Sequence, residues 1–124
     1  MSDKDFCEKT AIHSGVKVWL EGSYNFFGPG TIKLLKMVDE VGSVREACAR
    51  LEMSYSKGWK LIHKTEEQLG YQVVERSAGG KKGGKAEITD KGKALIQLFE
   101  EYENRVAEAA TKIYKEMFED CSLF

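Results

Sequence analysis

Two helix start signals follow one another in the middle of the chain, with room for only a short helix between them. Ser43 and Glu46 have the spacing of a capping box, in which the serine hydroxyl accepts from the N–H three residues on and the glutamate reaches back. We therefore expect a short helix over 44–51, a tight turn, and then a longer helix over 55–69 that Ser54 caps. A short capped helix joined by a turn to a second helix is the helix-turn-helix arrangement.

Both predicted helices have one side suited to burial. In the short helix this side consists of small or apolar residues, namely Val44, Ala47, Cys48 and Leu51. In the longer helix they recur at steps of three and four, as Gly58, Ile62, Thr65 and Leu69. The opposite side is polar, basic and aromatic, with Tyr55, Ser56, Lys57, Trp59, Lys60, His63 and Lys64. Trp59 either packs at the edge of a binding surface or completes the core, and both interpretations remain open.

The segment before this pair contains a predicted strand and a predicted helix. Residues 1–15 have no clear period and are expected to form a flexible arm. Apolar residues alternate with others over 16–21, which favours a half-buried strand, and the glycine-rich segment 22–30 is expected to be a loop. Pro29 then begins a helix over 29–41 with one apolar stripe.

A β-hairpin is predicted directly after the helix pair. Residues 72–76 and 86–89 have strand character, and the loop between them is rich in glycine and lysine. A hairpin in this position makes the winged variant of the motif, because glycines keep the loop thin and lysines attract phosphate. The expected fold class is mostly α (α+β), a winged helix-turn-helix over 16–89 with a small antiparallel sheet and a long C-terminal dimerisation helix.

The last helix is predicted over 90–118 and would be about 43 Å long. That length exceeds what a core of this size covers, so the rest of its apolar stripe requires a partner helix, most simply from a second copy. We expect a homodimer whose interface, within residues 90–124, uses Leu95, Leu98, Phe99, Tyr102, Val106 and Ile113.

Charge is distributed unevenly along the chain. The formal net charge is −1, but residues 45–93 have 11 basic and 7 acidic side chains, whereas residues 94–124 have 3 and 7. The middle segment is therefore the candidate surface for an anionic partner. A solvated surface without a partner explains the same charge equally well. The combination with a polar helix and a cationic hairpin favours double-stranded DNA. The helix over 55–69 is expected in the major groove, and the basic loop 78–85 on the DNA backbone or in the minor groove.

Two stretches of the sequence resemble a known family. Residues 42–59, with the Ser54-Tyr55 start, and residues 73–92, with the glycine-lysine loop, resemble the winged helix-turn-helix of the molybdate-responsive ModE-type regulators. The LysR-type regulators share the general scheme, including Leu69-Gly70 and the position of Arg76. The resemblance covers about residues 16–118.

The resemblance implies a dimeric DNA-binding regulator of transcription. Three widely spaced cysteines without a C-x-x-C pair separately favour a reduced, cytoplasmic protein. The family's DNA-facing positions fall here on Ser54, Tyr55, Ser56, Lys57 and Lys60, with Arg76, Lys81, Lys82 and Lys85 on the DNA backbone. Similar full-length regulators have a molybdate-binding module after the long helix, and this sequence ends at Phe124. We therefore expect a stand-alone DNA-binding half that takes no molybdate and no other cofactor.

Other chemistries receive little support. The segment 79–86 nearly matches a phosphate-loop pattern, but Ala86 stands where a hydroxyl would bind Mg²⁺, and a strand follows instead of a helix. His13 and His63 have no acidic or cysteine neighbours at ligand spacing, so no metal site is expected. Cys48 is expected to be a core residue, and Cys121 is the better candidate for a thiol switch.

One further function competes with DNA binding. The acidic segment 94–124 also suits a protein-interaction module that dimerises with, or modulates, a larger regulator. No enzyme is expected, because the sequence has no acid–base or nucleophile constellation. No apolar run is long enough to span a membrane.

Overall fold

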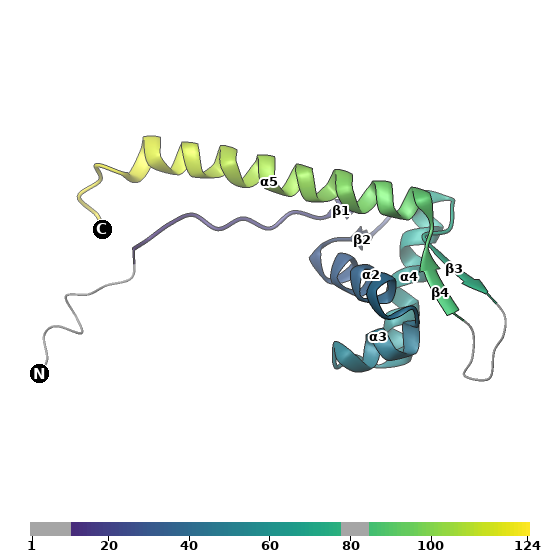
Figure 1. Cartoon of the computed structure of the whole chain (residues 1–124). Helices are drawn as coiled ribbons and strands as arrows, with labels where there is room; N and C mark the ends of the chain where they lie inside the picture. The colour runs from purple at the N-terminus through teal and green to yellow at the C-terminus, as the bar shows by residue number, and fades with distance from the viewer. Residues whose placement is uncertain (1–10, 78–84) are drawn as a thin grey trace, which may run out of the picture. The chain divides into compact units, whose positions relative to one another are not determined.

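The computed structural model describes residues 11–77 and 85–124. They form two compact units, one of residues Val18–Glu101 and one that contains residues 11–17 and 102–124. The elements, in chain order, are β1 (Leu20–Glu21), β2 (Asn25–Phe27), α2 (Pro29–Val41), α3 (Val44–Arg50), α4 (Tyr55–Leu69), β3 (Val74–Ser77), β4 (Lys85–Ile88) and α5 (Asp90–Phe118) (Figure 1). The predicted fold class, a mostly α winged helix-turn-helix, is confirmed.

The core of the Val18–Glu101 unit collects the apolar side of every helix in it. Buried residues come from α2, α3, α4, the β3–β4 hairpin and the first turns of α5, among them Leu34, Leu35, Val38, Ile62, Val73, Ile88 and Ile96. Gly42 and Gly70 end α2 and α4 in the left-handed conformation, at φ 74° and 79°. Glycine adopts this conformation without the steric cost that a Cβ would add.

The hairpin of β3 and β4 is antiparallel, with Val74 opposite Ile88 and Ser77 opposite Lys85. Its strands begin and end one or two residues away from the predicted bounds. Val74, Ala86 and Ile88 face the core, whereas Glu75 and Arg76 are exposed. The hairpin is thus attached to the body through one apolar side.

The prediction for the N-terminal strand was wrong in extent. Only Leu20–Glu21 is a strand: Val16 is 50% exposed, whereas Val18 and Leu20 pack partly against the core. Its partner is β2, which lies in the segment predicted as a loop. The ring of Phe27 in β2 is fully buried and meets Phe99 edge to face at 5.3 Å between ring centroids.

The unit that contains the end of α5 has an aromatic cluster of its own. Tyr114, Phe118 and Phe124 stack on one another, with centroids 5.3–6.5 Å apart. The Tyr114 hydroxyl donates to the carbonyl of Ile12 at 3.2 Å. Across the ranges that the structure describes, no helix is both long and apolar enough to cross a membrane.

Candidate nucleic-acid interface

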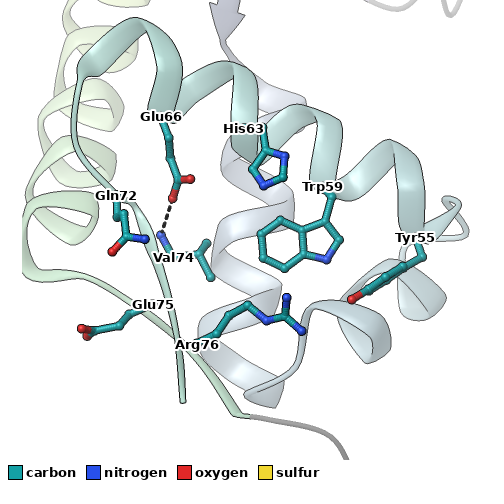
Figure 2. A pocket seen from close by; sticks show the side chains of 8 residues that line it. All are labelled: Tyr55, Trp59, His63, Glu66, Gln72, Val74, Glu75 and Arg76. Carbon is teal, nitrogen blue, oxygen red and sulfur yellow. Dashed lines mark hydrogen bonds between the residues drawn. The ribbon is translucent and has the colours of Figure 1, made fainter. Parts of the chain in front are cut away.

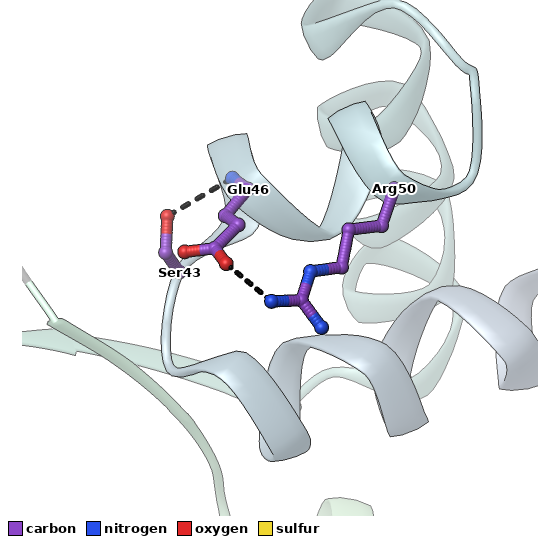
Figure 3. Close-up of polar contacts among 3 residues, drawn as sticks. All are labelled: Ser43, Glu46 and Arg50. Atoms are coloured by element: carbon purple, nitrogen blue, oxygen red, sulfur yellow. Dashed lines mark hydrogen bonds and ion pairs between the residues drawn. The ribbon is translucent and has the colours of Figure 1, made fainter.

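The start of α3 is fixed by Ser43. Its hydroxyl accepts from the Glu46 N–H at 3.1 Å, as predicted (Figure 3). The reciprocal half of the capping box is absent: the Glu46 carboxylate pairs instead with Arg50, one turn further on, at 2.9 Å. The Arg50 guanidinium is thus bound to the Glu46 carboxylate. An i, i+4 ion pair on a helix holds both side chains close to the helix.

Helices α3 and α4 approach each other closely at Gly58. A Cβ on Gly58 would lie 2.3 Å from the sulfur of Cys48, which is 1% exposed. Burial raises the pKa of the Cys48 thiol, so this sulfur remains an apolar packing group at neutral pH. The turn between the helices contains Glu52 at φ 56°, a left-handed conformation that closes the turn tightly.

The first half of α4 presents polar and basic side chains to solvent. The Ser54 hydroxyl caps the helix by accepting from the Lys57 N–H at 3.1 Å, and Ser56, Lys57 and Lys60 are exposed. The sequence analysis placed all four, with Tyr55, on the DNA side. The cap occupies one lone pair of the Ser54 hydroxyl, which leaves Ser56 as the less committed hydroxyl.

The turn between β1 and β2 contacts the C-terminal end of α4. The Tyr24 hydroxyl donates to the Glu67 carboxylate, and this bond is the main reason that the pKa of Tyr24 is raised. The Ser23 N–H donates to Gln68 at 2.9 Å, and the Lys64 ammonium lies 5.1 Å from the Tyr24 ring centroid. These contacts bind Glu67, Gln68 and Lys64 to the turn, whereas Ser56, Lys57 and Lys60 in the first half have no such contact with it among the described residues.

The hairpin is held against α4 by Glu66. Its carboxylate accepts from the N–H group of Val73 at 2.9 Å and from that of Val74 at 3.2 Å, and Figure 2 shows the second of these bonds. Sequence reasoning missed Glu66, because its two donors come from the chain beyond Gly70 and no local spacing indicates them. Two bonds to a charged acceptor fasten the start of β3 to α4.

Arg76 of β3 points to α4 and not away from it. Its guanidinium carbon lies 4.9 Å from the centroid of the Trp59 ring, and the ring of His63 lies 5.1 Å from Trp59 (Figure 2). Together with Glu66 and Gln72, these side chains line an open groove of about 640 Å³. Trp59 is partly buried against the core and also forms the wall of this groove, so its two interpretations both apply.

The basic side chains of this surface form no ion pair with any other residue that the structure describes. Over residues 11–77 and 85–124 the ion pairs are Lys36 with Glu100 and Arg50 with Glu46. Lys57, Lys60, Arg76 and Lys85 belong to neither pair, and Lys85 is exposed at the start of β4. The predicted contacts Lys81 and Lys82 lie outside the described residues.

The described residues do not form a metal centre. Among them there is no group of three or more histidine, cysteine, aspartate or glutamate side chains placed to hold an ion. The surface therefore offers cations, hydroxyls and aromatic rings, which is the donor set for a polyanion.

Comparison with known proteins gives the family. Residues 30–93 match the bacterial regulatory helix-turn-helix proteins of the LysR family. The chain belongs to this family. The match begins in α2 and ends in the first turn of α5, so it includes the helix pair and the hairpin described above.

Individual relatives indicate which regulators the chain is similar to. The chain is 36% identical over 75 residues to the DNA-binding transcriptional dual regulator ModE of Escherichia coli K12, covering 60% of this chain and 29% of that protein. The transcriptional regulator ModE of Yersinia pestis is also 36% identical over 75 residues, with 60% and 28% covered. The resemblance to ModE-type regulators is thus confirmed, although the chain spans less than a third of their length.

The crystal structure of ArgP from Mycobacterium tuberculosis matches with a TM-score of 0.47 and 25% identity, covering 72% of this chain and 30% of that one.

The residues predicted for a dimer interface differ in how far they are exposed. Leu98, Tyr102 and Ile113 are 67%, 45% and 53% exposed. Val106 is half-buried, and Leu95 packs partly against the core. Phe99 is 2% exposed and contacts Phe27, so it belongs to the core of its own chain; a 3.6-residue stripe does not distinguish the buried side of α5 from its exposed apolar side.

Proposed function

We propose that this chain is a sequence-specific DNA-binding regulator of transcription. The first half of α4 enters the major groove, and the β3–β4 hairpin follows the DNA backbone beside it. The observation that carries the proposal is the contact of Arg76 with Trp59, because it holds a hairpin cation next to the exposed half of α4. Family membership and the ModE relatives support the same function.

The proposed DNA contacts are of two kinds, to base edges and to phosphates. Ser56 and Lys57, in the first turn of α4, are proposed to contact base edges, with Tyr55 and Ser54 beside them. Lys60, Arg76 and Lys85, with Lys81 and Lys82, are proposed to contact phosphates, which fixes the register of the protein on DNA. The proposal contains no catalytic step. We also propose a cytoplasmic location, because the matching regulators are bacterial and bacterial DNA lies in the cytoplasm.

Replacing a phosphate contact is the direct test. We expect Lys60→Ala to weaken binding to all duplexes alike and to lower the slope of log affinity against log salt by about 0.9, the share of one phosphate contact. Ser56→Ala is expected to change the preference among sequences instead. Both are measured by fluorescence anisotropy with fragments selected from genomic DNA by the purified protein, and with mixed-sequence duplexes.

Lys33→Ala is the matched control. Lys33 is exposed on α2, one turn from Lys36, whose ammonium pairs with Glu100 of α5 and not with the α4 surface. Lys33→Ala removes one positive charge, as Lys60→Ala does, and should leave the affinity for DNA and the salt slope unchanged. Equal losses for Lys33 and Lys60 would contradict the proposed surface, and a chain that binds no duplex at low salt would favour the protein-interaction module.

We also propose that the chain is a homodimer through α5. On this proposal, residues 16–89 bind DNA and residues 90–124 pair the two copies. The support is an exposed apolar series on α5, namely Leu98, Tyr102, Ile113 and Met117, which are 45–67% exposed. Such residues rarely stay uncovered in a helix of 29 residues.

A charge placed in this series should separate the copies. We expect Ile113→Lys to raise the dimer dissociation constant at least about tenfold, because each copy then buries an ammonium in place of an apolar side chain. Thr111→Lys adds the same charge at an exposed position on the other side of the helix and should leave the constant unchanged. Sedimentation equilibrium distinguishes the two, and a monomeric parent chain would refute the dimer.

A further inference from the structure

Two arginines lie on aromatic rings of α4, one on each side of its exposed half. The guanidinium carbon of Arg45, from α3, lies 4.2 Å from the centroid of the Tyr55 ring. That of Arg76, from β3, lies 4.9 Å from the centroid of Trp59. The two rings meet edge to face, with centroids 6.4 Å apart and planes at 85°. The four side chains form a continuous row from α3 across α4 to the hairpin.

The aromatic rings in the middle of this row are fixed. Tyr55 and Trp59 are both partly buried and pack against the hydrophobic core. They are four residues apart on α4, so one helical turn holds them side by side. A cation over such a ring is restricted to one region of space, and this reduces the entropy that it loses when it binds a ligand.

The arginines at the ends of the row remain available. Both are exposed, and within the described ranges the carboxylate-bound cations are Lys36 and Arg50. Stacking uses the flat side of a guanidinium and leaves the N–H groups along its edge able to donate. Oriented, unpaired guanidinium edges are suited to phosphate, which they bind in a bidentate manner.

We propose that Arg45 is a phosphate-binding residue that acts as the counterpart of Arg76, and that Tyr55 and Trp59 are positioning residues that hold the two guanidinium groups. This proposal rests on the proposed function and adds a residue that the sequence analysis did not select. It also changes the role of Tyr55, which acts through Arg45 and not on a base edge. The two arginines contact the DNA backbone on either side of the segment that α4 reads.

The first test concerns Arg45 itself. With a labelled mixed-sequence duplex of about 30 base pairs, which covers nearly three turns, Arg45→Ala is expected to lower the salt slope by about 0.9. Its affinity should fall on every sequence alike. Arg45→Lys retains the charge and should retain the slope, but with weaker binding, because an ammonium is a point charge without the planar fork.

The second test concerns the positioning role of Tyr55. Tyr55→Phe retains the ring and should bind mixed and selected duplexes as the parent does. Tyr55→Leu should weaken binding about two- to fivefold, the contribution of an exposed cation–π pair, without changing the salt slope. In a chain that already has Tyr55→Leu, Arg45→Ala should then reduce the affinity for DNA less than it does in the parent chain. A purely structural role of Tyr55 would not produce this difference.

The outcomes separate this inference from the proposed function. If Lys60→Ala weakens binding while Arg45→Ala behaves as the Lys33→Ala control, the DNA surface stands and the role of Arg45 is refuted. A change of sequence preference in Tyr55→Phe would show that its hydroxyl reads a base and would refute the positioning role. A parent chain that binds no duplex overturns both proposals. Thermal unfolding by circular dichroism confirms that each variant is folded.

Discussion

Gly58→Ala is expected to lower the free energy of unfolding by about 2–3 kcal/mol, although alanine is the better helix former. The added Cβ would lie 2.3 Å from the Cys48 sulfur, closer than nonbonded atoms approach. To relieve this overlap α3 and α4 must move apart, and both pack through buried surfaces. Chemical denaturation monitored by circular dichroism measures the change.

The double variant Cys48→Ala/Gly58→Ala tests the cause. Removing the sulfur leaves Leu34 and Met53 as the nearest neighbours of the new Cβ, both at 3.8 Å, which is ordinary van der Waals contact. We expect the double variant to be more stable than Gly58→Ala alone. If the losses in free energy of unfolding for Cys48→Ala and Gly58→Ala simply add in the double variant, the contact between these two residues does not set the helix spacing.

Phe99→Ala is expected to destabilise the chain by about 3–5 kcal/mol, the range for truncating a large buried aromatic residue. The Phe99 ring is 2% exposed and fills the space against Phe27, so its loss leaves a cavity between α5 and β2. For a small domain this corresponds to a fall in melting temperature of at least about 12 °C. Thermal unfolding at several protein concentrations measures it.

The neighbouring residue provides the control for Phe99→Ala. Leu98 is 67% exposed on the same helix, so Leu98→Ala creates no cavity within the chain. Its effect on stability should be small at low protein concentration, where any dimer is dissociated. Equal losses in the two variants under those conditions would show that Phe99 is not part of the core of a single chain.

The long elements could be predicted from sequence because each has many repeats of its period. The helices α2, α4 and α5 have the predicted bounds, since apolar residues at steps of three and four continue over several turns. Strand β2 was missed because three residues are too few to show alternation. What gives it stability is Phe27, whose burial depends on Phe99 far along the chain.

The candidate site was only partly predictable for the same reason. Exposed lysines of α4 follow from the helical period once its apolar side is known. The spacing of Tyr55, Trp59 and His63 in steps of four indicates three rings on one side, a signal that could have been used. Arg45 and Glu66 could not be selected, because their partners come from different elements that only the folded chain brings together.

The turn that contacts the end of α4 has a consequence for how such a protein diverges. Glu67 and Gln68 are bonded to Tyr24 and Ser23, so substitutions at these two positions disturb the fold before they affect recognition. Positions 56 and 57, which we propose to contact base edges, have no such bonds among the described contacts. On that proposal, retargeting the protein to a new operator is a matter of exchanging a few side chains near one helix end, while the scaffold that presents them stays unaltered.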